Sequence, residues 1–188
     1  MFHPDSLEKA LQLLGDLLAD RDQHFEVVAI GGGALQLIGV IDRPTKDIDL
    51  VALVEGGKLV GAGTFPAALA EAVADVARSL KLPADWMNGA PASLLDFGLP
   101  PGFQDRLEHR KYGRGLELSL ASRLDQIHFK LYATTDDAPG GKHHRDLKKL
   151  QPSPEELRLA AEWAKTHDTS EGFARLLAEV LRDFGIDD

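Results

Sequence analysis

Residues 27–51 read VVAIGGGALQLIGVIDRPTKDIDLV and decide the fold. The stretch begins as an apolar strand, breaks at three consecutive glycines, continues as a short apolar helix, and ends in a second apolar run that contains Asp47 and Asp49. Alternate side chains of a strand share a face, so these two carboxylates are predicted to project together, roughly 6–7 Å apart. A pair placed in this way can bind a divalent cation, and it indicates phosphoryl or nucleotidyl chemistry.

The glycines are Gly31, Gly32 and Gly33, between the predicted strand and the helix. Successive backbone N–H groups at such a position can bind phosphate. The dinucleotide-binding fingerprint needs glycine or alanine at its sixth position, where this chain has Gln36, and a Walker A loop needs a Gly-Lys-Ser/Thr that does not follow. The triplet is therefore either a different phosphate-binding turn or a tight turn that needs positive φ.

The two acids have neighbours that suit phosphate and metal chemistry. Close carboxylates repel each other unless a cation lies between them, and Mg²⁺ prefers oxygen ligands of this kind. Arg43, Thr45 and Lys46 lead directly into the acidic strand and are candidate phosphate contacts. Glu117 lies in the alternating segment LELSL and is the best candidate for a third metal-binding carboxylate.

Composition restricts the class of protein. The chain has 188 residues, enough for one domain or a compact domain with a helical appendage, and no cysteine, so disulfides and thiolate metal sites are excluded. No apolar run approaches the ~20 residues of a membrane span, and the N-terminus lacks the pattern of a signal peptide. We therefore expect a cytoplasmic protein with no membrane partner. A net charge of −9 argues against broad nucleic-acid binding, although positive charge gathers in residues 106–114 and 142–149.

Periodicity and turn signals outline a small mixed sheet with helices, followed by a helical C-terminal part, so the predicted fold class is α+β. The expected domains are a core over residues 1–121 and a helical region over residues 122–188. Helices are predicted over 5–20, 34–38, 66–80, from 122, 143–150, from 153 and 169–184; strands over 25–30, 45–54, 106–112 and 116–120; an irregular connection over 82–102; and a linker over 134–142.

Taken together, these residues resemble the nucleotidyltransferase superfamily, the fold of DNA polymerase β. The closer resemblance is to the bacterial branch that includes the AbiEii-type toxins of abortive-infection systems. It covers about residues 20–185. It is carried in order by the blocks GGGALQLIG, RPTKDIDLV, DWMNGAP, GLELSLAS, HFKLYA, HHRDLKKL and PSPEELRLAAEWAKTH.

The resemblance implies that Asp47 and Asp49 are metal ligands and that the glycine pair is the triphosphate turn. It further implies that Lys130 and Asp146 complete the site as the downstream lysine and acid, with the helical C-terminal region completing the active-site cleft. The implied activity is Mg²⁺-dependent transfer of a nucleoside monophosphate from an NTP such as ATP to a tRNA, a protein or a small molecule. The implied biological role is that of a toxin with an antitoxin partner.

One departure from the pattern supports an alternative. Many members of the superfamily carry serine where this chain has Gly33, so the alternative is an inactive module of the same fold that binds nucleotide or a protein partner.

Several remaining side chains have simpler interpretations. Arg145 is a further candidate for phosphate contact, and Trp86 could stack on a base, whereas Trp163 is predicted to be core because of its helical spacing. His143 and His144 are adjacent, so on a helix they point about 100° apart and chelate a metal poorly. We interpret them as part of a basic edge.

Overall fold

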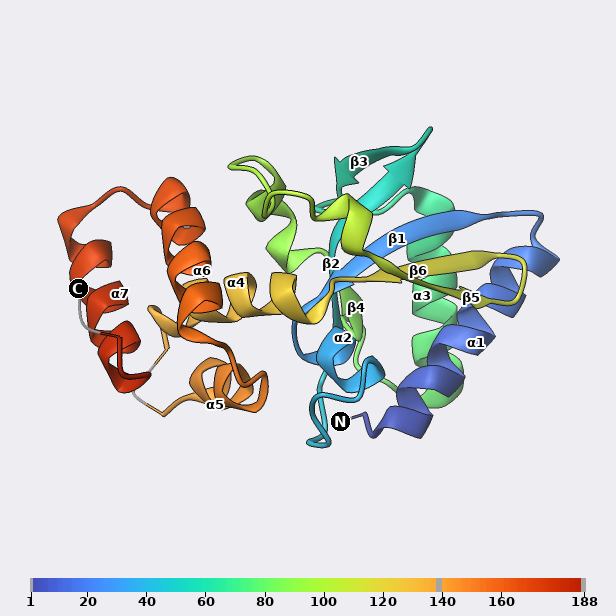
Figure 1. Ribbon diagram of the computed structural model, residues 1–188. Coiled ribbons are helices and arrows are strands. Elements are labelled where there is room, and N and C mark those ends of the chain that lie inside the picture. Colours follow the sequence, from blue (N-terminus) through green and yellow to red (C-terminus); the bar gives the residue numbers. More distant parts are fainter. Residues whose placement is uncertain (1, 138–139, 187–188) are drawn as a thin grey trace. The chain divides into compact units, whose positions relative to one another are not determined.

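The computed structural model describes residues 2–137 and 140–186 (Figure 1). The chain divides into two compact units. The first comprises the residues up to Gly98 together with Gln104–Ala121, and the second comprises Leu99–Phe103 and the residues from Ser122 onward. A short piece of the long connection thus belongs with the C-terminal helices. Each unit is described by itself below.

The first unit is built on an open mixed sheet of six strands, so the predicted α+β class with a small mixed sheet is confirmed. The strand order is β3-β2-β1-β6-β5, and β4 pairs with β2. The pairs β1–β2, β2–β3 and β5–β6 are antiparallel, whereas β1–β6 and β2–β4 are parallel. The strands are β1 Phe25–Ile30, β2 Ile48–Glu55, β3 Lys58–Gly61, β4 Met87–Asn88, β5 Glu108–Tyr112 and β6 Leu116–Leu120.

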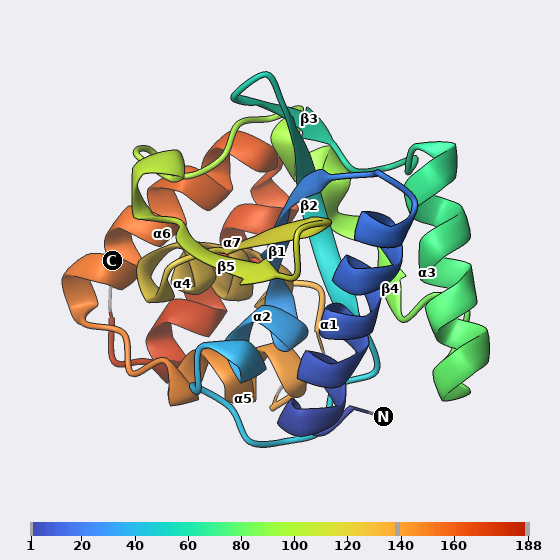
Figure 2. The same cartoon turned by 90° about the vertical axis from the view of Figure 1, so that its right-hand side faces the viewer.

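Two helices cover one face of this sheet, α1 (Pro4–Asp20) and α3 (Ala67–Leu80), and they lie side by side (Figure 2). Their apolar residues recur every three or four positions, and four leucines of α1 are fully buried in the core, namely Leu7, Leu11, Leu14 and Leu18. Ile48 and Leu50 of β2 belong to the same core. Asp49, which lies between them, is therefore on the opposite face of the strand.

The structure corrects two boundaries next to the glycines and acids. The second apolar strand begins at Ile48 rather than at residue 45, because Thr45 forms both of its backbone hydrogen bonds with Phe2 (2.6 and 3.0 Å) instead of extending the sheet. The following helix, α2 (Gly31–Leu37), begins at the first glycine rather than at residue 34. Asp47 consequently lies in the irregular segment just before β2 and not within the strand.

The glycine-rich segment after β2 and the connection predicted to be irregular both contain short elements. The glycine-rich turn at residues 55–63 holds the β2–β3 hairpin, which turns at Gly56 and Gly57 with φ of +57° and +78°. The connection over residues 82–102 holds β4 and the 3₁₀ helix η1 (Ala90–Leu95). A second 3₁₀ helix, η2 (Gln104–Arg106), precedes β5. Both β4 and η1 are too short to show a period in the sequence.

The second unit is helical, with α4 (Arg123–Thr134), α5 (Lys142–Lys149), α6 (Pro154–His167) and α7 (Glu171–Asp183). The predicted linker over residues 134–142 includes residues 138–139, which lie outside the described residues. Trp163 is 7% exposed and meets the Phe129 ring edge-on at 5.5 Å, so its core position is confirmed. In the part of the chain that the structure describes, none of the helices combines the length and apolar character that a membrane crossing needs.

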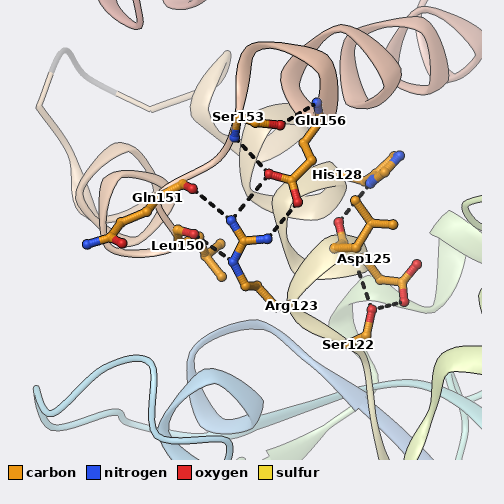
Figure 3. A network of polar contacts seen from close by, with 9 residues as sticks. Ser122, Arg123, Asp125, His128, Leu150, Gln151, Ser153 and Glu156 are labelled. Atoms are coloured by element: carbon orange, nitrogen blue, oxygen red, sulfur yellow. Dashed lines mark hydrogen bonds and ion pairs between the residues drawn. The ribbon is translucent and has the colours of Figure 1, made fainter.

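Arg123 ties the start of α4 to the connection between α5 and α6 (Figure 3). Its guanidinium donates to the carbonyls of Leu150 (2.9 Å) and Gln151 (2.7 Å) and to the Glu156 carboxylate (2.6 Å). Glu156 also completes the predicted capping box of α6 with Ser153. This bonding, Arg123 foremost, lowers the pKa of Glu156, so the carboxylate is held in its ionised form.

Candidate functional site

The end of β1 places the first glycine against Asp49. Ile30 is the last residue of β1 and pairs with Asp49 in β2, so the chain reaches Gly31 directly beside that carboxylate. Gly31 has φ of +76°, a conformation that favours glycine. A Cβ atom at this position would lie only 2.8 Å from Asp49 Oδ2. The backbone and the carboxylate thus approach each other more closely than any other residue type would allow.

The second glycine lies beside the polar segment that precedes β2. A Cβ atom on Gly32 would lie 3.2 Å from Thr45 Oγ1 and 3.5 Å from Arg43 Nη2. Thr45 is buried, and its hydroxyl donates to the Asp47 carbonyl at 3.1 Å. Lys46, in contrast, is exposed. A cation, a hydroxyl and a carboxylate therefore surround the glycine turn.

The third glycine has a packing role. A Cβ atom on Gly33 would lie 2.8 Å from the Asp47 carbonyl oxygen and 3.0 Å from Ile48 Cα. Both atoms belong to the backbone, so they cannot move aside as the end of a flexible side chain could. Glycine at position 33 lets α2 pack against the start of β2, and a serine there would collide with this segment.

Asn88 is a site residue that the sequence reasoning did not assign. It is the second residue of β4 and pairs in parallel register with Asp49. Its Nδ2 donates to Asp49 Oδ1 at 3.2 Å, and its Oδ1 accepts from the backbone N–H of Ala90 at 2.9 Å. The block DWMNGAP pointed to this segment, but the pairing of a two-residue strand with β2 leaves no pattern in the sequence.

Glu117, predicted as the third metal ligand, does not lie beside Asp49. In β6 it pairs with Glu26 of β1, four residues before the Ile30 that faces Asp49. The separation is about 13 Å along the strands and two strand spacings of about 4.8 Å across them. Its carboxylate instead lies 3.5 Å from Lys111 Nζ.

The remaining donors, Asp47 and Asp49, fit a magnesium ion whose coordination shell is completed by substrate. Asp47 and Asp49 are both half-buried, and the glycine turn forms a cradle beside Asp49 that any side chain at position 31 would fill. Among residues 2–137 and 140–186, no cluster of three or more histidines, cysteines or acids could hold a metal by itself. Mg²⁺ commonly takes one or two carboxylates and completes its octahedron with waters and phosphate oxygens. The donor set fits that pattern.

Lys130 and Asp146 form an ion pair inside the second unit. Lys130 Nζ on α4 lies 2.8 Å from Asp146 Oδ2 on α5, and the two residues are 3% and 1% exposed. Nearby, burial together with the positive charges of Lys130 and Lys142 lowers the pKa of His143 to about 4. His143 is therefore neutral at physiological pH, which corrects its interpretation as part of a basic edge.

Two further candidates have other roles. Trp86 does not stack on a base, because it is fully buried, its Nε1 donates to the Val73 carbonyl at 3.0 Å, and its ring lies 5.9 Å from that of Phe2. Arg145 is exposed and donates to the Gly140 carbonyl at 2.6 Å.

No family model, no curated protein and no solved structure matches this chain. The geometry around Asp49 and the motifs that surround it are therefore the basis of the functional argument.

Proposed function

We propose that the chain is a Mg²⁺-dependent nucleotidyltransferase, which transfers a nucleoside monophosphate from an NTP to an acceptor. The observation that carries the proposal is the position of the Asp49 carboxylate against Gly31, the positive-φ glycine at the end of β1. The order of motifs, a glycine pair ahead of Asp-x-Asp, supports the same conclusion through its resemblance to the superfamily. The proposal rests on the first unit alone.

Each residue of the site has a role in this proposal. Asp47 and Asp49 hold the Mg²⁺, while the backbone at the glycine turn and the Arg43 guanidinium contact the phosphates. When bound, Mg²⁺ neutralises negative charge that develops on the phosphates. The acceptor oxygen bonds to the α-phosphorus as the bond to the bridging oxygen breaks, and pyrophosphate leaves. One of the two carboxylates takes the proton of the acceptor hydroxyl.

Label transfer from NTP tests this activity. The purified chain is incubated with each α-labelled NTP and Mg²⁺, with bulk tRNA as acceptor and without it, so that transfer to RNA and transfer to protein are both detected. We expect Asp49→Asn to reduce transfer to background, because it removes the negative charge that holds the cation. Glu117→Gln is the matched control, since it removes an acid of the same sheet at a distance from Asp49, and it should retain activity. Transfer that survives Asp49→Asn would contradict the proposal.

A nucleotide-binding module without turnover is the second candidate. The observation that favours it is the displacement of Glu117, which leaves two acids where a two-metal mechanism usually has three. Binding of a labelled NTP that requires Asp49, without label transfer to any acceptor, would support the module over the enzyme.

A toxin role is compatible with the enzyme, and it places the chain in the cytoplasm with an antitoxin partner. Growth arrest on expression, abolished by Asp47→Ala, would support that role. Unchanged growth when the chain is expressed would argue against the toxin role.

A further inference from the structure

We propose that the outer edge of β5 is a docking site for an extended acidic segment of a partner protein, which adds to the sheet as a further strand. β5 is an end strand, because it pairs with β6 on one side and with no other strand among residues 2–137 and 140–186. β6 and β1 lie between β5 and β2, so this edge is separate from the Asp49 site. Docking at β5 and nucleotidyl transfer can therefore be tested independently.

Hydrogen bonds at both ends of β6 show which of its backbone groups point towards β1. The Gly115 carbonyl accepts from the Phe25 N–H at 3.0 Å, and the Ala121 N–H donates to the Ala29 carbonyl at 3.1 Å. Successive residues of a strand direct their backbone groups to alternate neighbours. The odd-numbered residues of β6 therefore face β1, and the even-numbered residues face β5.

The outer edge of β5 presents the backbone of His109 and Lys111. Directly opposite residues of an antiparallel pair either bond to each other or both point away. Arg110 is opposite Leu118, an even-numbered residue of β6, so its backbone groups face β6. The N–H and C=O groups of His109 and Lys111 consequently point away from the sheet, in the arrangement with which an added strand pairs.

Charge along this edge favours an acidic occupant. The side chains of His109 and Lys111 are 57% and 76% exposed, and as alternate residues of β5 they share one face of the sheet. Arg114, in the turn that follows β5, is also exposed. Acidic side chains at alternate positions of an added strand would lie directly beside His109 and Lys111, and cross-strand pairs of opposite charge are stabilising.

A second copy of the chain is a poor occupant of the same edge. Antiparallel pairing of two β5 strands through all of their outward groups would place Lys111 opposite His109 of the other copy and bring the two Arg110 side chains directly opposite each other. Like charges in such positions are destabilising. The chain has a net charge of −9, so an acidic segment is repelled over most of the surface and attracted where basic side chains gather.

A pair of replacements at one position tests the backbone contact. The probe is a short synthetic peptide in which glutamate alternates with threonine, labelled for fluorescence anisotropy and added to the full chain. His109→Pro removes the outward N–H and leaves the bonds from β5 to β6 intact, because proline is tolerated at such a position of an edge strand. We expect it to weaken peptide binding by roughly 10-fold, as for the loss of one backbone hydrogen bond. His109→Ala is the matched control, since it loses the same side chain and keeps the N–H, and it should bind as tightly as the native chain.

Two replacements of opposite sign test the contribution of charge. Lys111→Glu should weaken binding of the acidic peptide by roughly 5-fold or more, because it replaces an attractive cross-strand pair with a repulsive one. Glu117→Gln removes the carboxylate that lies 3.5 Å from Lys111 Nζ, so it should tighten binding. A peptide with lysine in place of glutamate should bind the native chain more weakly than the acidic peptide. Equal binding of the two peptides, or no binding of either, would overturn the acidic docking site.

Amide hydrogen exchange identifies how the peptide binds. The peptide should slow exchange at the His109 and Lys111 amides, whereas the Arg110 amide, which faces β6, is already protected in the free chain. Binding without this alternation, or equal losses in His109→Pro and His109→Ala, would overturn strand addition. Thermal unfolding of each variant identifies misfolding, and the exchange pattern of the native chain keeps the test decisive if His109→Pro is unstable.

Two further outcomes would assign the edge to a different occupant. A native chain that is dimeric by light scattering, and that His109→Pro converts to a monomer, would show that a second copy pairs with β5. A single-stranded RNA oligonucleotide that binds more tightly than the acidic peptide, and that depends on Lys111 but not on the His109 N–H, would show a nucleic-acid surface. Either result would overturn the proposal.

Discussion

Two acids of this protein, Asp49 in the first unit and Asp146 in the second, have opposite environments. Asp146 is almost fully buried and lies against the ammonium of Lys130, so its charge is balanced within the fold. Asp49 is half-buried, accepts from the Asn88 amide, and lies beside the backbone of Gly31. The buried ion pair with Lys130 is enough to account for Asp146 as a structural residue. Asp49 lies instead at a half-buried backbone turn, which has the surroundings of a ligand site.

The largest expected effect comes from breaking the buried pair. Asp146→Ala leaves the Lys130 charge buried without its carboxylate, which should lower the free energy of unfolding of the second unit by about 3–5 kcal/mol. The double replacement Lys130→Met with Asp146→Leu should recover most of this loss because neither charge remains. The chain has two tryptophans, so urea unfolding in a Trp86→Phe background reports on the second unit through Trp163. If Asp146→Ala is as stable as its parent, the ion pair does not contribute to the stability of the second unit.

Replacing Gly31 should have an intermediate effect. Gly31→Ala forces alanine to φ of +76° and brings its Cβ against Asp49 Oδ2. We therefore expect the free energy of unfolding to fall by more than the ~1–3 kcal/mol that such a backbone conformation costs. Gly39→Ala is the matched control, since Gly39 has φ of +75° but nothing within 4 Å of its Cβ position. Urea unfolding in a Trp163→Phe background measures both variants. Equal losses would mean that the contact with Asp49 has no energetic consequence.

A smaller loss of stability is expected when the pH is lowered. The pKa of His143 is lowered from 6.5 to about 4, mainly by burial, with Lys130 and Lys142 acting in the same direction and Asp137 and Asp146 opposing them. The unfolded chain therefore binds the proton first, and stability is lost as the pH falls from about 6.5 towards 4. His143→Gln should flatten the pH dependence of urea unfolding in this range. An unchanged slope would exclude His143 as its source.

The smallest effect on stability is expected at Asp49. Asp49→Asn should change the free energy of unfolding of the first unit by less than about 1 kcal/mol, because a half-buried amide can keep the hydrogen bond from Asn88. The same variant should lose Mn²⁺ binding. A loss of stability as large as that of Asp146→Ala would make Asp49 a structural acid and remove the contrast between the two units.

Local sequence patterns predicted the elements that carry their own signals. The α1 leucines at helical spacing and the Ser153–Glu156 capping box of α6 both gave the right helix. Glu117 and Asn88 are two residues whose positions the local patterns could not predict. The alternation around Glu117 correctly indicated a strand, yet strand register separates it from Asp49, while the two-residue strand β4 brings Asn88 into contact.

The sequence by itself determined the fold class, the helices with clear periodicity, and the presence of a glycine turn ahead of two acids, because these depend on side-chain spacing within a few turns of chain. The tertiary structure decided which groups meet. It placed Gly31 against Asp49, packed Gly33 against the start of β2, and buried Lys130 with Asp146. The physical reason is that strand register and helix packing are set by the fit of residues far apart in the chain, and no local pattern encodes that fit.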